Sequence, residues 1–295
     1  NEDNWSACLG ILGGTPGQFN SINDTLPDEH LPTLIEAEVL DAHYVALEFS
    51  EPIDSLTLVN ANFIIEPVLG SFQRLVFSYD NCINSAQCLL VFSQEIPKST
   101  PFEIQIENIA DCWLNFTTIA TSTVRYEAPT NGDLLINELL FDPPIEGEDF
   151  VELYNNSQKY LDLSGCGIHN GQDSIYLTAC KISPQQCLAL SSDTHFLTAF
   201  YPYALQENLK EINLPYFYND SGSCVLFNDI TILDSLRYSA SWHFPLLPDS
   251  EGFSLERLNF NASTQDPENW FSAAASYGGA TPGRANSQQS SATAT

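Results

Sequence analysis

The sequence predicts an all-β chain, organised as two β-sandwich domains in tandem with few short helices. Short segments in which apolar and polar residues alternate recur along the chain. Residues 102–107 (FEIQIE) show this alternation, which is the period of a strand with one buried face. Turn residues separate these segments at spacings typical of sandwiches, and no long helical periodicity occurs between them.

The predicted strands can be read off in chain order. Over residues 44–49, alternation places Val45, Leu47 and Phe49 on one face. Glu48 lies on the other face. Short helical turns are expected near residues 192–200 and 266–275, where an Asp or Ser can cap the first turn. The other predicted strands cover residues 75–79, 88–92, 150–154, 187–190, 224–227, 231–236 and 253–258.

Two polar, turn-rich segments divide the chain. They are residues 20–32 (NSINDTLPDEHLP) and residues 128–133 (APTNGD). We therefore expect six parts: the end of a preceding module (1–21), a linker (22–31), a first domain (32–127), a linker (128–132), a second domain (133–287) and a low-complexity tail (288–295).

An internal repeat relates the two ends of the chain. Residues 4–21 contain NWSA and then GGTPGQFNS, and residues 269–287 contain NWFSA and then GGATPGRANS. Because so many matches occur in order, with nearly identical spacing, we infer that residues 1–21 end one module and that a whole module of the same kind follows the middle block. The Gly-Gly turn and the fixed φ of Pro are expected to close the last strand, with the Trp as a core anchor.

The chain is strongly acidic. Nine Lys and Arg against 38 Asp and Glu give a net charge of −29, which excludes a binder of nucleic-acid phosphates and argues against anionic membrane surfaces. With 43% hydrophobic residues the 295-residue chain can still bury a core. Its apolar runs are shorter than the ~18 residues of a membrane span, so no membrane insertion is expected. The lack of Met predicts a chain that starts inside a longer gene product or after a processed leader.

Eight cysteines form an even set without the CxxC spacing of zinc sites. This predicts disulfides and an oxidising compartment, whereas the alternative is buried free thiols that behave as small hydrophobes. Two pairs are close in sequence and are predicted to be bonded, Cys82 with Cys88 and Cys180 with Cys187. The other four cysteines are isolated: Cys8, Cys112, Cys166 and Cys224.

The second domain resembles the bacterial lamin tail domain over about residues 131–287. The matching motifs are LINELLFDP (135–143), DFVELYN (149–155), LDLSG (161–165), SLER (254–257), NW (269–270) and TPG (281–283). WHFPLL (242–247), which precedes SLER, resembles a variant common in secreted bacterial proteins. The resemblance implies a compact immunoglobulin-like β-sandwich. The chain departs from it at Cys166, where the family often has Trp, and this departure suggests a disulfide between Cys166 and Cys224.

The middle block resembles the bacterial Ig-like domains of surface-layer and adhesin-type proteins. VALEFSEPID (45–54) resembles their strand and turn, and IADC followed by Asn115 resembles their Asp-x-x-Gly-Asn corner with the Gly missing. Such modules alternate with lamin tail domains in large exported proteins of Gram-negative bacteria, often cargo of type IX secretion. The resemblances therefore imply an extracellular or cell-surface location.

Catalytic motifs are missing from the sequence. It has no G-x-S-x-G elbow, no H-E-x-x-H and no P-loop, and its five histidines lack metal-ligand spacing, so we expect no enzyme. His243, between Trp242 and Phe244, is expected to be packed and hydrogen-bonded. Hydrolysis by paired carboxylates stays open as an alternative, because their geometry is spatial.

Acidic residues gather around a Pro-Pro turn, and this density of oxygen ligands predicts a Ca²⁺ site. The alternative is a solvated acidic loop. Glu152 shares its strand face with Phe150 and Tyr154, so it is expected to point inward, where it needs a backbone N–H, an Arg or a cation. The candidate ligands are Glu138, Asp142, Glu146, Glu148, Asp149 and Glu152.

An aromatic-rich segment offers a platform that can stack on sugars or meet a partner protein. The alternative is that it packs over one end of the sandwich. Its aromatic residues are Tyr201, Tyr203, Tyr216, Phe217 and Tyr218.

These observations predict a non-enzymatic segment of a larger secreted or cell-surface protein, acting in spacing, adhesion or docking. The alternative is a carbohydrate- or protein-binding accessory region of a secreted enzyme. The expected partners are other modules of the same polypeptide, surface proteins or glycans.

Overall fold

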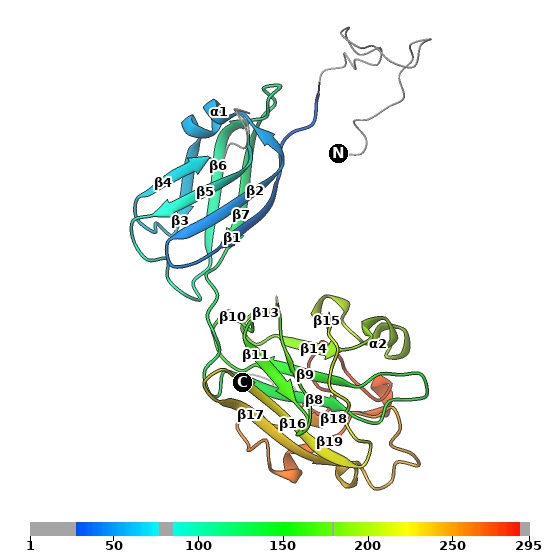
Figure 1. Cartoon of the computed structure of the whole chain (residues 1–295). Coiled ribbons are helices and arrows are strands. Elements are labelled where there is room, and N and C mark those ends of the chain that lie inside the picture. Colours follow the sequence, from blue (N-terminus) through cyan, green and yellow to red (C-terminus); the bar gives the residue numbers. More distant parts are fainter. Residues whose placement is uncertain (1–27, 77–84, 179, 290–295) are drawn as a thin grey trace, which may run out of the picture. The chain divides into compact units, whose positions relative to one another are not determined.

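The computed structural model describes residues 28–76, 85–178 and 180–289 (Figure 1). Within these residues the regular structure comprises 19 strands, two short α-helices and a few 3-10 turns, which confirms the predicted all-β class. The chain divides into two compact units, Asn1–Glu95 with Phe102–Thr123, and Ile96–Pro101 with Val124–Thr295. The repeat segment at residues 4–21, Cys8 and Cys82 lie outside the described residues.

The first unit contains two antiparallel sheets, with strand orders β1-β2-β5-β4 and β3-β6-β7. Phe92 on β5 contacts Phe102 on β6 across the two sheets, with ring centroids 6.5 Å apart. Helix α1 (Ser55–Asn60) begins at Asp54, whose side chain accepts the N–H groups of the first turn. The strands are β1 (Leu34–Val39), β2 (Tyr44–Ile53), β3 (Asn62–Glu66), β4 (Phe72–Val76), β5 (Ser85–Phe92), β6 (Phe102–Ala110) and β7 (Phe116–Thr123).

The second unit is built on a six-stranded sheet with the order β15-β14-β9-β8-β18-β19. A four-stranded sheet, β12-β11-β16-β17, and the pair β10-β13 accompany it. The strands are β8 (Leu134–Leu140), β9 (Phe150–Asn155), β10 (Leu161–Asp162), β11 (Cys166–His169), β12 (Ser174–Tyr176), β13 (Lys181–Ile182), β14 (Cys187–Ser191), β15 (Leu209–Glu211), β16 (Ser221–Asn228), β17 (Ile232–Ser239), β18 (Leu255–Arg257) and β19 (Trp270–Ser272).

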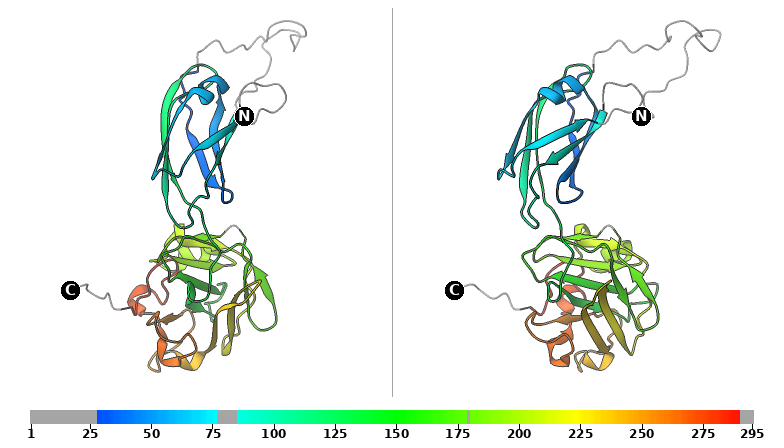
Figure 2. Two further views of the ribbon diagram at one scale, coloured as in Figure 1. Left: turned by 90° about the vertical axis from the view of Figure 1, so that its left-hand side faces the viewer. Right: turned by 60° about the vertical axis from the view of Figure 1, so that its left-hand side comes forward.

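Both faces of the six-stranded sheet are buried. On one face, Ile136 and Val151 belong to a core cluster that also contains Leu226 of the four-stranded sheet. On the other face, Phe150 packs with Tyr201 and with residues of α2 (Thr194–Phe200) and the C-terminal segment. The orange-to-red C-terminal segment lies on this unit in both views of Figure 2. Because both faces are covered, every residue of β8 is buried, whereas a strand with one wet face would alternate.

The helical turn predicted near residues 192–200 is confirmed as α2, and Asp193 caps it by accepting the N–H of Phe196 at 2.8 Å. Near residues 266–275 the prediction holds only in part. Pro267–Asn269 forms a 3-10 turn, and the chain then continues as β19. No helix within the described residues is long and apolar enough to cross a membrane.

Candidate functional site

Three glutamates lie side by side on neighbouring strands of the six-stranded sheet. Glu138 on β8 is paired with Glu152 on β9 and with Glu256 on β18. All three are 0% exposed. We call these three residues the carboxylate row. Buried carboxylates that lie this close repel one another and lose their hydration, so the row needs hydrogen-bond donors or protons.

The donors come from residues 281–288, which we call the strap. The strap runs along the row and supplies backbone N–H groups to every carboxylate. These bonds run from Thr281 to Glu138 (2.8 Å), from Gly283 to Glu152 (2.6 Å), and from Ser287 and Gln288 to Glu256 (3.0 and 2.9 Å).

One side chain of the strap bridges two members of the row. The hydroxyl of Thr281 lies 3.0 Å from Oε2 of Glu138 and 2.7 Å from Oε1 of Glu256. A hydroxyl has one proton to donate, so both contacts are hydrogen bonds only if one carboxyl group is itself protonated. Burial raises the pKa of Glu138 well above its usual range and that of Glu152 to about 8, and the neighbouring carboxylates add to both shifts. The row therefore retains protons at neutral pH.

A β-bulge in β8 brings an amide into the same row. The pairing with β9 shifts between Ile136 and Glu138, which leaves Asn137 as the extra residue. Nδ2 of Asn137 donates to Oε1 of Glu152 at 2.7 Å and to Oδ1 of Asn286 at 2.8 Å. In return, Nδ2 of Asn286 donates to Oδ1 of Asn137 at 3.1 Å. These two buried amides fasten the strap to the bulge.

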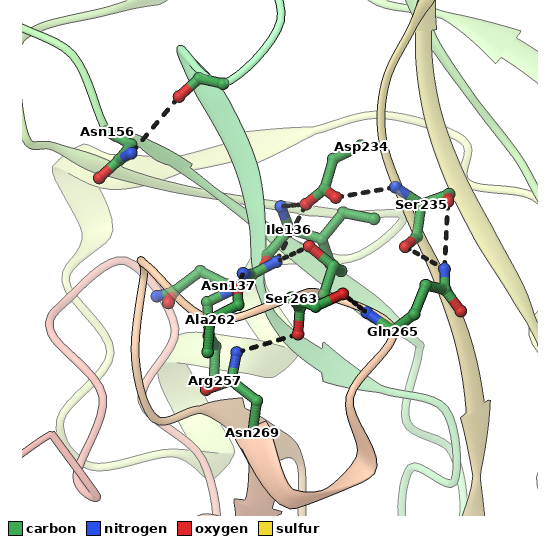
Figure 3. Close-up of polar contacts among 12 residues, drawn as sticks. Ile136, Asn137, Asn156, Asp234, Ser235, Arg257, Ala262, Ser263, Gln265 and Asn269 are labelled. Atoms are coloured by element: carbon green, nitrogen blue, oxygen red, sulfur yellow. Dashed lines mark hydrogen bonds and ion pairs between the residues drawn. The ribbon is translucent and has the colours of Figure 1, made fainter.

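A buried ion pair satisfies the backbone at the bulge (Figure 3). The N–H of Ile136 donates to Asp234 at 2.9 Å, and Nε of Arg257 donates to the carbonyl of Ile136 at 2.8 Å. Arg257 and Asp234 are themselves paired at 3.0 Å. The guanidinium of Arg257 also lies over the ring of Trp270, 5.3 Å from its centroid. The ion pair thus supplies hydrogen-bond partners to the N–H and the carbonyl of Ile136, in place of the strand-to-strand hydrogen bonds that the bulge removes.

The separated motifs that resemble the lamin tail domain meet at this constellation. LINE contributes Glu138, FVE contributes Glu152, SLER contributes Glu256 and Arg257, and TPG opens the strap. The sequence indicated that Glu152 points inward and needs a partner, and the structure provides backbone and amide N–H groups. Glu256 was not among the predicted site residues. Two features of the sequence could have pointed to it: its position in the SLER motif and the repeated TPG segment.

The six residues predicted to bind Ca²⁺ do not converge. Within the described ranges, the acidic group whose ligand atoms all lie within 4.8 Å of one another is Asp28, Glu51 and Asp111 of the first unit. Glu138 and Glu152 belong to the row, whereas Asp142 accepts a hydrogen bond from Asn219. Glu146 and Glu148 are exposed on the loop, which fits the alternative of a solvated acidic loop.

Asp149 differs from its acidic neighbours because it is buried. Its Oδ2 accepts the N–H of Phe217 at 2.9 Å, and its Oδ1 has no hydrogen-bond partner. Burial is the main cause that raises its pKa to about 7, and the charges of Glu148 and Asp142 add to the shift.

The acidic group of the first unit surrounds a chain corner. Oδ1 of Asp111 accepts the N–H groups of Trp113 at 2.8 Å and Asn115 at 2.9 Å. Nδ2 of Asn115 donates to Oδ2 of Asp111 and to the carbonyl of Asp28, both at 2.8 Å. Burial and then the charges of Asp111 and Asp28 raise the pKa of Glu51. Sequence reasoning did not bring these three acids together, because they are far apart in the chain.

The predicted aromatic platform is divided. Tyr201 and Phe217 are buried in the core, and the hydroxyl of Tyr201 donates to the carbonyl of Gly252. Tyr216 and Tyr218 are exposed and pack edge to face, with ring centroids 5.5 Å apart. Tyr203 is also exposed, and it packs against Tyr277.

The predicted disulfides Cys180–Cys187 and Cys166–Cys224 are wrong, since all four residues are free buried thiols. Cys180 lies in the core between the sheets, whereas the sulfur of Cys187 lies 3.8 Å from Nδ2 of Asn137, beside the carboxylate row. Cys166 is paired with Asn228, four residues along β16 from Cys224, which separates them by about 13 Å along the strand. A disulfide requires Cα atoms within about 7 Å. Cys88 is likewise a buried thiol, and Cys82, its predicted partner, lies outside the described residues.

His243 is buried, with Nδ1 2.9 Å from the hydroxyl of Ser272. Its ring packs against Phe141, with centroids 5.5 Å apart. Burial lowers its pKa to about 4, so it is neutral and part of the packing at physiological pH.

Comparison with known proteins gives distant likenesses only. No protein-family model and no curated protein matches the chain. Three solved structures of the bacterial S-layer protein SbsC match: its N-terminal part (7% identity, TM-score 0.28), rSbsC(31-844) (7%, 0.27) and domains 1-6 (6%, 0.26). Each match covers 71% of this chain and 41–44% of the other, so this chain spans less than half the length of those structures. TM-scores of this size do not establish a shared fold or function.

Proposed function

We propose that the chain is a non-enzymatic segment of a larger secreted or cell-surface bacterial protein, in which it acts in spacing and docking. The observation that carries this proposal is the carboxylate row and its strap. In the second unit, the residues of the repeated TPG segment and of the motifs that resemble the lamin tail domain form hydrogen bonds with one another. They hold a module together and present no reactive group to solvent.

Hydrolysis by paired carboxylates finds no support at the row. Glu138, Glu152 and Glu256 are adjacent, but each is fully buried and bonded to the strap. A glycoside hydrolase needs its two carboxyl groups on either side of an accessible sugar bond. The row offers no such opening.

The proposed location rests on the charge and on the two resemblances. A net charge of −29 keeps a protein soluble and suits a region in contact with solvent. Export by type IX secretion rests on the resemblance to modular cargo proteins alone.

The location is tested by protease shaving of intact cells that express the natural gene with an epitope tag beside this segment. We expect proteinase K to remove the tag signal from intact cells while a cytoplasmic control protein stays whole. Protection of the tag in intact cells, with cleavage only after lysis, would contradict the proposal.

A second candidate function is carbohydrate binding, which the exposed Tyr216–Tyr218 pair favours. We expect any glycan retained on an array to be lost in the double variant Tyr216→Ala/Tyr218→Ala. Tyr176→Ala, which removes another exposed tyrosine of the same unit, serves as the control. Equal retention by all three proteins would reject this pair as the binding site.

A further inference from the structure

We propose that a surface hollow beside the strap binds an acidic sugar, a hexuronic acid unit of a glycan. The hollow has a volume of about 600 Å³, which is the size of a small-molecule site. Its walls come from the turn between β13 and β14, from the end of β9 and from the strap. This ligand site goes beyond the spacing and docking role proposed above, and the Tyr216–Tyr218 pair is not part of it.

The hollow differs in charge from the rest of this acidic chain. None of the described residues that line it is an Asp or a Glu, although the chain has 38 of them. Its lining includes the half-buried guanidinium of Arg284. Nη1 of Arg284 lies 3.5 Å from the carbonyl of Tyr203, and its other N–H groups have no hydrogen-bond partner among the described residues. Since the guanidinium fork matches the geometry of a carboxylate, the hollow favours an acidic ligand.

Three polar side chains of the hollow have no hydrogen-bond partner in the described part of the chain. They are the hydroxyls of Tyr154 and Ser183 and the amide of Gln185. By contrast, Nε2 of Gln186 donates to Oδ1 of Asn208 at 2.5 Å, which fixes the wall behind them. The three unpaired groups can both donate and accept, and so can the hydroxyl groups of a sugar.

A stacked pair of rings forms the apolar wall of the hollow. Tyr154 and Phe260 lie face to face, with centroids 3.9 Å apart and an angle of 7° between the rings. A hexuronic acid carries one carboxylate and several hydroxyls on a ring whose C–H groups are apolar. Its C–H groups can therefore pack on the aromatic wall while its polar groups reach Arg284 and the three unpaired side chains.

The turn that carries Gln185 is held in a strained conformation. Gln185 has φ +58°, which glycine adopts without strain and residues with a Cβ adopt rarely. The N–H of Gln185 donates to the carbonyl of Asn155 at 3.0 Å, and the N–H of Ser183 donates to Oε1 of Gln186 at 2.9 Å. These bonds hold an exposed glutamine at the rim of the hollow. Backbone strain of this kind gathers at binding sites, where it fixes the position of a group.

The first experiment measures the ligand class by isothermal titration calorimetry of the full chain in buffer with EDTA. The probes are trigalacturonic acid, triglucuronic acid and the neutral maltotriose. We expect saturable binding of at least one acidic trisaccharide, roughly tenfold or more tighter than that of maltotriose, because only an acid can pair with Arg284. No binding of either acid, or equal binding of maltotriose, would overturn the proposal.

The second experiment separates the contact of Arg284 from the net charge. Arg284→Gln is expected to weaken binding of the acidic trisaccharide roughly tenfold, with its affinity for maltotriose unchanged. Arg237→Gln, at an exposed position of β17 in the same unit, makes the same change in net charge and is the control. Equal affinities of the two variants for the acid would show that the contact does not exist and would reject this site.

The third experiment separates binding from folding. Gln185→Gly is expected to keep or raise the melting temperature, because it relieves the strained angle, and yet to weaken binding roughly fivefold. Tyr154→Phe keeps the ring but removes the hydroxyl, and it is expected to weaken binding by a similar factor. Tyr176→Phe removes an exposed hydroxyl of the same unit that lies outside the hollow, and it is expected to bind as the parent does.

An affinity equal to that of the parent in either Gln185→Gly or Tyr154→Phe would contradict the proposed site. Such a failure leaves the cell-surface location untouched, since protease shaving tests that location separately.

Discussion

At the scale of single residues, the corner at residues 111–115 has leucine where the similar Asp-x-x-Gly-Asn pattern has glycine. Leu114 occupies the position of the glycine and has φ +65°, a left-handed conformation that costs a residue with a Cβ about 1–2 kcal/mol. The hydrogen bonds from Trp113 and Asn115 to Asp111 hold the corner in this shape. The side chain of Leu114 is exposed, so it gains little from packing.

We expect Leu114→Gly to stabilise the first unit by about 1 kcal/mol, because glycine adopts this angle without strain. Hydrogen exchange of strands β6 and β7 in the full chain measures the effect on this unit alone. Leu114→Ala is the control, since alanine keeps the Cβ and should bring no such gain. Equal protection in Leu114→Gly and the parent would show that the corner is not strained.

Residue identity predicted part of the site. The alternation around Glu152 correctly indicated an inward-facing carboxylate. Its partners could not be inferred, because Gly283 is 131 residues away and donates through its backbone, which any residue type except proline possesses. The even number of cysteines led to a wrong prediction of disulfides, because the count does not show which cysteines lie close together in space. The four described cysteines of the two predicted pairs are packed as small apolar groups.

At the scale of elements, the bulge of β8 depends on the pair Arg257–Asp234. Arg257→Met is expected to destabilise the second unit by about 3–5 kcal/mol, because it leaves the carboxylate of Asp234 buried without its cation. The urea midpoint of the second unit measures the loss. Arg237→Met, on the exposed face of β17, is the matched control. If both variants lose the same small amount, the bulge does not need the ion pair.

Strands with one wet face were the easiest elements to predict. β2 and β6 alternate buried and exposed residues, and sequence alternation identified both. α1 was missed, because SLTLVN has only six residues and includes the strand-favouring Thr57 and Val59. Only the cap of Asp54 marks its start. The predicted strand 253–258 is longer than the observed β18, which covers only Leu255–Arg257. Three residues are too few to show a period, so the sequence did not mark the ends of this strand.

At the scale of the whole molecule, stability should fall as pH rises above about 6.5. Below that pH the buried, neutral His243 acts in the opposite direction, because its pKa is lowered to about 4. The folded chain keeps the carboxyl groups of Asp149 and Glu152 protonated up to about pH 7 and 8, whereas unfolded carboxyls lose their protons near pH ~4. The folded state therefore binds more protons between these limits, and the stabilisation present below pH ~4 is lost as pH rises through 7 to 8. The net charge of −29 acts in the same direction through repulsion.

Thermal melts between pH 6.5 and pH 9, above the range in which His243 titrates, test this dependence. We expect the melting temperature to fall by several degrees, and the fall to persist in 0.5 M NaCl, which screens exposed charges but not buried groups. Asp149→Asn should flatten the curve, while Asp173→Asn, at an exposed position, should not. A melting temperature that is constant or rises over this range would contradict the assignment.

The position of the strap along the chain has a consequence for biogenesis. Thr281 follows Glu138 by 143 residues, so the carboxylate row gains the donors of the strap only when the last part of the module is present. Contacts this far apart in sequence form late, because a long loop must close first. While the polypeptide is being translated, the three glutamates remain hydrated and charged. We therefore expect the second unit to complete its fold only after its C-terminal end has left the ribosome.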